Sequence, residues 1–363
     1  MVLLSQLICF SFEKTVLTWN TSALKNSATI IPVSTPDCQV NSWKNTLKSA
    51  FSDSEQLLDY LQIEHSHYQQ QNPVQSNFPL RVPLPFADKM KKGDINDPLL
   101  LQVLAKQLEN QTVEGYSFDP LKEQQNTMPG LLHKYAGRVL LILTGACAVN
   151  CRYCFRRHFP YEQQLANGEN LDKNLKYIEN DATISEVILS GGDPLLISDG
   201  QLEQLISRLE KIKHLTRLRI HSRLPIVIPQ RLTSSLRRCL SETRLQTSLV
   251  IHANHSNEID DVLGERLTHF VQSGISLFNQ SVLLKNINDN PKTLARLSEK
   301  LFEFQVIPYY IHQLDPVAGA AHFDIDKNRA LEIMRQLGDL LPGYLLSKFV
   351  VEEPEKACKT VIL

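Results

Sequence analysis

The chain has 363 residues, of which 42% are hydrophobic and 21% are charged, and its formal net charge is -1. A chain of this size can bury a large core, and its near-neutral charge gives no sign of a nucleic-acid partner. No apolar run reaches the roughly 18 residues needed to cross a bilayer, so no membrane insertion is expected. The apolar start lacks a basic segment and a small-residue cleavage site, and is interpreted as structure rather than as a signal peptide.

The first part of the chain, residues 1–132, is predicted to be mainly helical. Apolar residues recur at helical spacing over residues 41–62 and 97–110, and a proline-containing loop over residues 72–86 separates the two segments. This pattern favours a helical extension ahead of the main domain.

Short apolar runs alternate with amphipathic segments over residues 133–345. Strands are predicted at residues 138–144, 186–190, 217–221, 248–252, 276–280 and 305–310. Helices are predicted between them, for example at residues 199–213, 258–273 and 291–304. Alternating strands and helices indicate an α/β fold with a parallel sheet, and six such units predict a partial (βα)6 barrel. Residues 346–363 are expected to form a separate C-terminal segment.

Three cysteines stand close together after the first predicted strand. Cys147, Cys151 and Cys154 form a C-x-x-x-C-x-x-C pattern, and Tyr153 precedes the last of them. Three thiolates on one loop can hold three irons of a four-iron cluster and leave the fourth iron open. The alternative is a zinc site in which His158 is the fourth ligand. The other cysteines are scattered, which suggests no disulfide framework and favours a reducing cytoplasm: Cys9, Cys38, Cys239 and Cys358.

Polar side chains follow each predicted strand at its carboxyl end, where parallel βα barrels place their chemistry. After the second strand comes a glycine pair, which lets the backbone approach a ligand closely. The residues at these strand ends are Ser190, Gly191, Gly192, Asp193, His221, Arg223, His252, Asn279, Gln280 and Asp315. We expect them to surround one mouth of the barrel.

Four ordered motifs resemble the lysine 2,3-aminomutase family of radical S-adenosylmethionine enzymes, and most closely its elongation factor P branch. They are LTGACAVNCRYCFRRHFPY at residues 143–161, VILSGGDPLL at 187–196, RIHSRLPIVIPQR at 219–231 and FNQSVLL at 278–284. The resemblance implies a radical S-adenosylmethionine barrel. It also implies a [4Fe-4S] cluster on Cys147, Cys151 and Cys154, with S-adenosylmethionine beside residues 190–193, His221, Arg223 and His252.

The same resemblance implies pyridoxal 5'-phosphate as a further cofactor. It assigns the Schiff-base lysine to Lys359, although the family's glycine-rich run before this lysine is missing and Lys356 is a rival. Residues expected around the pyridoxal ring and phosphate are Tyr135, Arg138, Asn279 and Gln280. Lys134 replaces an arginine that is often found in the family, and a lysine loses the planar fork that grips a phosphate.

For the substrate, the resemblance assigns Arg156 to the carboxylate, and Asp315 and Glu352 to the terminal ammonium. Two acids require a cationic ligand, because like charges are costly to bury together. Glu352 is one methylene longer than the usual aspartate. An ordinary solvated Glu352 is the alternative, since Glu353 and Glu355 extend the acidic run.

The predicted activity is therefore L-lysine 2,3-aminomutase, an isomerase that forms β-lysine of R configuration. The implied partners are an elongation factor P lysine ligase, which would use the product, and a reducing partner such as flavodoxin or ferredoxin. Alternatives are production of free β-lysine for metabolism, an aminomutase for another basic amino acid such as arginine, and a metal-binding module without activity. Assembly into a homo-oligomer is left open by the sequence.

Overall fold

The computed structural model describes residues 43–69, 78–124, 128–354, 356 and 358–363. Residues 35–363 cluster as one compact unit. The expectations for the first residues of the chain and for most of the loop at 72–86 fall outside the described residues. No helix in the described ranges is both long enough and apolar enough to cross a membrane.

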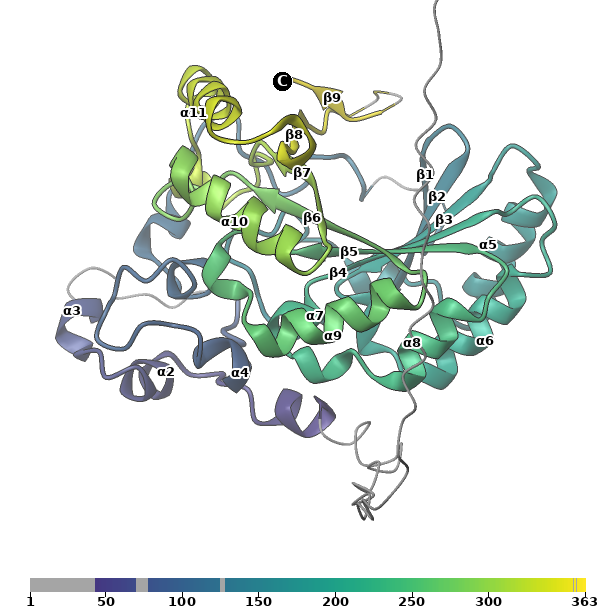
Figure 1. Cartoon of the computed structure of the whole chain (residues 1–363), viewed down its shortest axis with the longest axis horizontal. Helices are drawn as coiled ribbons and strands as arrows, with labels where there is room; N and C mark the ends of the chain where they lie inside the picture. The colour runs from purple at the N-terminus through teal and green to yellow at the C-terminus, as the bar shows by residue number, and fades with distance from the viewer. Residues whose placement is uncertain (1–42, 70–77, 125–127, 355, 357) are drawn as a thin grey trace, which may run out of the picture. The chain divides into compact units, whose positions relative to one another are not determined.

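One nine-stranded sheet forms the centre of this unit, and its spatial order follows the chain from β1 to β9 (Figure 1). Strands β2 to β8 are parallel to one another, whereas β1 and β9 pair antiparallel at the two ends. The strands are β1 Leu131–Tyr135, β2 Arg138–Thr144, β3 Glu186–Gly191, β4 Arg217–Ser222, β5 Gln246–His252, β6 Ser276–Val282, β7 Ile307–His312, β8 Lys348–Val351 and β9 Thr360–Val361.

The six predicted strands are confirmed as β2 to β7, and β8 extends the parallel part by one strand. The strand β1 forms a hairpin with β2, because Gly137 takes a φ of 73° and turns the chain between Tyr135 and Arg138. Among the described residues no pairing joins β1 to β9. The sheet is therefore a partial barrel, as the sequence predicts.

Helices cover the outer face of the sheet (Figure 1). Most of them begin at a side chain that caps the free N–H groups of the first turn, for example Ser198 at α6, Thr233 at α8 and Asp260 at α9. The helices of this layer are α5 Gly168–Asn180, α6 Asp199–Leu209, α7 Leu224–Val227, α8 Ser234–Ser241, α9 Asp261–Gln272, α10 Pro291–Glu303 and α11 Lys327–Leu340.

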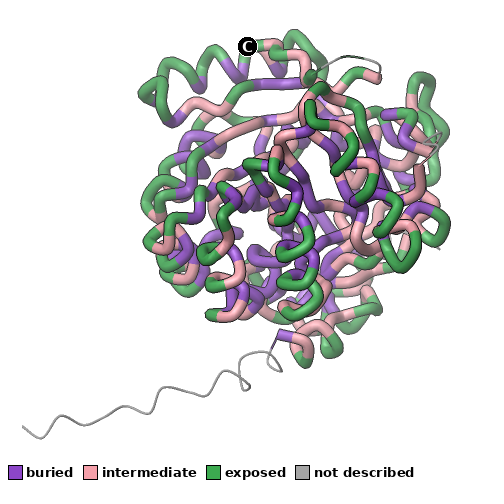
Figure 2. The backbone as a smooth tube through the Cα atoms, turned by 90° about the vertical axis from the view of Figure 1, so that its right-hand side faces the viewer, coloured by how far each residue is buried: buried purple, intermediate pink, exposed green. Residues whose placement is uncertain are grey.

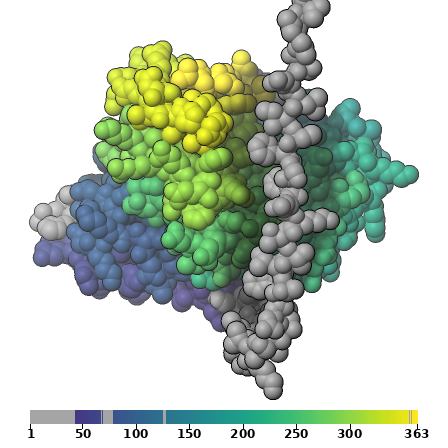
Figure 3. Space-filling model, viewed as in Figure 1, coloured from purple at the N-terminus to yellow at the C-terminus, as the bar shows by residue number. Residues whose placement is uncertain are grey.

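Buried backbone is concentrated on the interior strands, whereas the outer turns of the helices are exposed (Figure 2). The main core lies between the sheet and its helices and includes Leu249 and Ile251 of β5. A second core joins α10 and α11 to β8 through Phe349. In the space-filling view the C-terminal residues lie beside α11, above the surface of α10 (Figure 3).

The N-terminal region is less helical than the sequence predicts. A helical stretch at residues 43–48 is followed by α2 Ser54–Tyr60, α3 His65–Gln69 and α4 Leu84–Ala87. The helix predicted at residues 97–110 is wrong: two short 3-10 turns, Leu100–Gln102 and Gln107–Asn110, occupy this range. The physical reason is a competing contact, because the carbonyl of Gln102 accepts the Arg152 amide of the cysteine loop at 2.9 Å.

Substitution of the buried Leu249 tests the contribution of this core. We expect Leu249→Ala to lower the free energy of unfolding by about 2 to 5 kcal/mol, because it removes methyl groups and leaves a cavity. Val262→Ala is the control, since Val262 is 56% exposed on α9. Denaturant unfolding followed by circular dichroism measures both. A loss at Val262 equal to that at Leu249 would contradict this placement of the core.

Candidate active site

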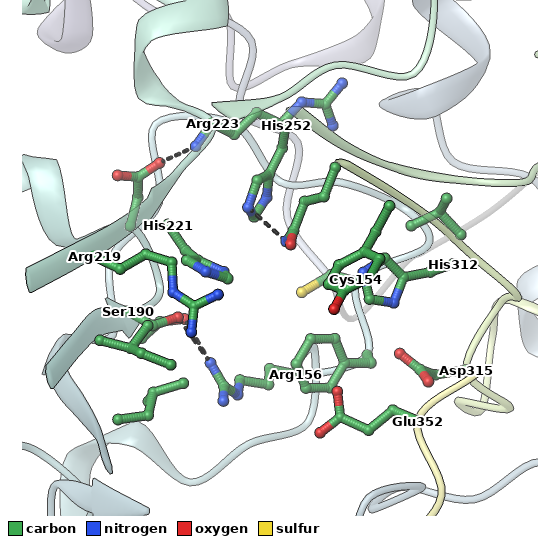
Figure 4. Close-up of a pocket in the computed structure, with 18 of the residues that line it drawn as sticks. Cys154, Arg156, Ser190, Arg219, His221, Arg223, His252, His312, Asp315 and Glu352 are labelled. Atoms are coloured by element: carbon green, nitrogen blue, oxygen red, sulfur yellow. Dashed lines mark hydrogen bonds between the residues drawn. The ribbon is translucent and has the colours of Figure 1, made fainter. Parts of the chain in front are cut away.

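A cavity of about 570 Å³ lies at the carboxyl ends of the parallel strands. Because strand side chains alternate between the two faces of a sheet, every second residue faces this cavity. On β4 these residues are Arg217, Arg219 and His221, and on β6 they are Phe278, Gln280 and Val282. Figure 4 shows Arg156, Asp315 and Glu352 at one side of the cavity, with Arg223 and His252 at the opposite side.

The cysteine loop forms one wall, and Cys147, Cys151 and Cys154 all line the cavity. Burial raises the pKa of Cys147, and the neighbouring thiols add to this effect. Burial likewise raises the pKa of Cys154 to about 11. Buried thiols of this kind need a positively charged partner to ionise, which iron ions supply.

A buried ion pair holds the cysteine loop in place. Arg152 donates to Glu109 through Nε at 2.8 Å, and Arg157 donates to the same carboxylate through Nη2 at 2.8 Å. Glu109 lies 43 residues before Arg152 in the sequence and was not predicted to take part. Arg152 and Arg157 lie on either side of Cys154 in the sequence, so their shared carboxylate partner holds both flanks of this cysteine in place.

The zinc alternative finds no support in the geometry. His158 is exposed, and its ring contacts the carbonyl of Ala318 and the ring of Phe118. Across the described ranges, no three His, Cys, Asp or Glu side chains are arranged around a single metal position. The thiols, which share one wall of the cavity, fit a multi-iron cluster better than a single tetrahedral ion.

The glycine pair after β3 passes directly against the cysteine loop. A Cβ at Gly191 would lie 2.6 Å from the carbonyl oxygen of Thr144, and one at Gly192 would lie 2.3 Å from that of Ala146. Only glycine fits here. Ser190 and Asp193 also line the cavity, and Asp193 accepts hydrogen bonds from the Ser222 hydroxyl and the Arg223 amide. This segment therefore joins three strand ends.

Three half-buried histidines line the cavity: His221, His252 and His312. Burial lowers the pKa of His252 to about 3 and lowers those of the other two well below the usual value, so all three are neutral at pH 7. The ring of His252 contacts the Gln280 amide at 2.7 Å. In the described part of the chain, Nε2 of His221 and of His312 has no hydrogen-bond partner. Such atoms fit a polar ligand.

The predicted pair Asn279 and Gln280 does not face the cavity together. Gln280 lines it, whereas Asn279 bonds to the backbone of Ala253 through both its oxygen, at 2.9 Å, and its nitrogen, at 3.1 Å. Adjacent residues of a strand point to opposite faces, which explains the separation. Asn279 stabilises the neighbouring strand end instead.

Tyr135 and Arg138 lie together on the hairpin at the first edge of the sheet, with the Arg138 guanidinium 4.6 Å from the centre of the Tyr135 ring. Both line the cavity, as does Lys359. The rival Lys356 is exposed, and its amide donates to the carbonyl of Glu353.

A series of side chains with alternating charge lies along one side of the cavity. Glu123, which was not predicted, pairs with Nε of Arg156 at 2.7 Å and with Lys134 at 3.0 Å. Lys134 also lies 3.4 Å from Glu352, which in turn pairs with Lys359. The side chains thus follow one another in space in the order Arg156, Glu123, Lys134, Glu352 and Lys359.

The two acids Asp315 and Glu352 differ in protonation. Burial would raise the pKa of Glu352, but Lys359 and Lys134 hold it at about 2. For Asp315, burial and the negative charge of Glu352 raise the pKa to about 7. The cavity therefore holds one ionised carboxylate and one that ionises near neutral pH, which together suit a cationic ligand.

Comparison with known proteins agrees with this fold. Residues 141–234 match the radical SAM superfamily model, which defines the class. An L-lysine 2,3-aminomutase from Escherichia coli is 46% identical over 91% of this chain and 97% of its own length. One from Haemophilus influenzae is 48% identical over 86% and 94%. Another from Clostridium subterminale is 33% identical over 90% and 79%.

The chain belongs to the L-lysine 2,3-aminomutase family of radical SAM enzymes, and it is an isomerase. Its cofactors are a [4Fe-4S] cluster, S-adenosylmethionine and pyridoxal 5'-phosphate. The donor set fits this combination, because one cavity offers three thiols, a lysine amine and the buried, unpartnered ring nitrogens of two histidines, His221 and His312.

The protonation of Asp315 generates a pH prediction. We expect the cavity to bind 1,5-diaminopentane more tightly as the pH rises through about 7, because Asp315 loses its proton there and attracts an ammonium group. The histidines titrate well below this range. Calorimetric titrations on anaerobic protein at several pH values measure the affinity. Asp315→Asn should abolish the increase, and an unchanged pH dependence in this variant would contradict the assignment.

Proposed function

We propose that the protein converts L-lysine to β-lysine of R configuration. The observation that carries this proposal is the meeting of three groups in one cavity: the three cysteines, Lys359, and the acids Asp315 and Glu352. The names of the most similar relatives support the same reaction. When bound, the cofactors supply the radical that removes hydrogen and the carbonyl that holds the migrating nitrogen.

The residues of this chain hold the reacting groups in position. Lys359 is the proposed attachment point of pyridoxal phosphate, and Tyr135, Arg138 and Gln280 are its proposed neighbours. The exposed position of Lys356 supports this choice. Positive charge suits the phosphate, and Arg138 brings it to the edge of the cavity. Residues 190–193, His221, Arg223 and His252 are the proposed surroundings of S-adenosylmethionine.

The substrate is proposed to lie between Arg156 and the acidic pair. Glu352 is neutralised by Lys359 in the structure. Pyridoxal phosphate held on the Lys359 amine would remove this cationic partner from Glu352, and the terminal ammonium of lysine would then replace it. Arg156 is oriented by Glu123, which leaves Nη1 directed toward Ser190 at 3.3 Å on the cavity side. Holding both ends of lysine fixes which carbon faces the radical.

The resemblance of the four motifs to the elongation factor P branch supports a destination for the product. We propose that a separate ligase transfers the β-lysine to elongation factor P, and that the enzyme works in the cytoplasm with flavodoxin or ferredoxin as its electron donor. A ligase assay with purified elongation factor P would distinguish this destination from free β-lysine, since only the former predicts transfer of the enzyme's own product.

The decisive experiment for the reaction is an anaerobic assay of the reconstituted protein. We expect L-lysine, S-adenosylmethionine, pyridoxal phosphate and dithionite to yield β-lysine, separated from α-lysine by chromatography. The product should disappear when either cofactor is omitted. Formation of 5'-deoxyadenosine without β-lysine would retain the radical chemistry and overturn the choice of substrate.

The attachment of pyridoxal phosphate is tested by a pair of lysine variants. We expect Lys359→Ala to lose both the covalent label left by borohydride reduction and the formation of β-lysine, because no amine is left in place for the cofactor. The matched variant Lys356→Ala should keep both. Mass spectrometry of peptides locates the label. Labelling that survives in the first variant and vanishes in the second would assign the role to Lys356.

A further inference from the structure

A network of hydrogen-bonded polar side chains lies beside Cys151, and the contacts within this network have no role in the reaction as derived above. It connects the first 3-10 turn, the cysteine loop, the end of β4 and the loop after β5. Its members are Gln102, Tyr153, Arg223, Asn254 and Glu258. Gln102 and Glu258 are fully buried, and Arg223 is 5% exposed.

Arg223 is held between a cysteine and a carboxylate. Its Nη1 lies 2.7 Å from Sγ of Cys151 and 2.6 Å from the hydroxyl of Tyr153. Its Nη2 donates to Gln102 at 2.6 Å and to Glu258 at 3.1 Å. Arg223 lines the cavity, but both terminal nitrogens of its guanidinium are engaged within the protein, and one of them contacts the cysteine sulfur directly.

Glu258 is fixed independently of Arg223. Its Oε1 accepts hydrogen bonds from the backbone amides of Asn254 at 2.9 Å and His255 at 3.1 Å, and from the Gln102 amide at 3.1 Å. The carboxylate therefore keeps its position when the arginine is changed. The negative charge lies on the far side of the guanidinium from Cys151.

Burying an ion pair is costly, so its presence directly behind a cluster ligand calls for a compensating gain. Hydrogen bonds and positive charge next to a ligand sulfur favour the electron-rich reduced state of an iron–sulfur cluster and raise its reduction potential. A carboxylate behind the donor acts in the opposite direction. Arg223 lies between Cys151 and Glu258, and this is the arrangement that such an adjustment of the reduction potential requires.

We propose that Arg223 is a positioning residue that raises the reduction potential of the cluster through Cys151, and that Glu258 limits this effect. The step concerned is the transfer of one electron from an external reductant to the cluster, from the 2+ to the 1+ state, with no bond made or broken in the protein. The proposal depends on the cluster of the family and is independent of the amino-acid substrate.

The test is a redox titration of the full-length, cluster-reconstituted protein, followed by electron paramagnetic resonance, without S-adenosylmethionine or lysine. We expect Arg223→Gln to decrease the ratio of reduced to oxidised cluster at a fixed potential by about tenfold, a shift of about 59 mV for one electron. Glu258→Gln should shift the potential in the opposite direction. Dithionite with mediators supplies the electron.

Arg231→Gln is the matched control. Arg231 is also fully buried and pairs with a carboxylate, Asp199, at 2.7 Å. It also donates to the carbonyls of Leu195 and Ile197, and its guanidinium lies 5.0 Å from the centre of the Trp43 ring. It should leave the potential unchanged, while thermal unfolding reports any loss of stability.

Unchanged potentials in both network variants, or shifts of the same sign, would overturn the proposal. If Arg223→Gln does not retain iron, Glu258→Gln decides alone, and a potential equal to that of the wild type counts against the proposal. Formation of β-lysine by the wild-type enzyme is measured separately, so a failure of the proposed reaction is distinguishable from a failure here.

Discussion

The parallel alignment of β2 to β8 brings the carboxyl ends of seven strands to one edge of the sheet. Most groups in the cavity depend on this alignment, because it brings residues that are far apart in the sequence to neighbouring strand ends. Cys147 follows β2, His221 ends β4, and Lys359 stands between β8 and β9. The alternation of side chains then decides which residues enter the cavity and which enter the core.

Electrostatics connects the cysteine loop to the C-terminal residues across this edge. The alternating charges from Arg156 to Lys359 join the cysteine loop, the segment before β1, β1 itself and the C-terminal residues. Each buried charge has a neighbour of opposite sign, which offsets part of the cost of removing it from water. The same series of charges begins at Arg156, which is proposed to hold the carboxylate of the substrate. It includes Glu352, one of the two acids proposed to hold the ammonium group.

Lys134 and Glu352 are the two positions of this series at which the resemblance led us to expect a different residue, an arginine and the shorter aspartate. The two side chains lie 3.4 Å apart, so the longer acid reaches the ammonium group of the lysine. Lys134 is thereby engaged with two carboxylates, Glu123 and Glu352, rather than with a phosphate-binding surface.

The sequence by itself determined the six strands β2 to β7 and the cysteine loop, because each rests on local spacing or on a motif. That the glycine pair packs against the backbone of the cysteine loop was decided by the tertiary structure. The sequence could not determine that Gln102, Glu109, Glu123 and Glu258 support the site, since lone polar residues carry no periodic signal and their partners lie up to 156 positions away. The tertiary structure also decided that residues 97–110 form 3-10 turns and that Asn279 faces away from Gln280. For residues 97–110 a contact with a distant backbone group outweighs the local pattern. For Asn279 the pleat of the sheet does so.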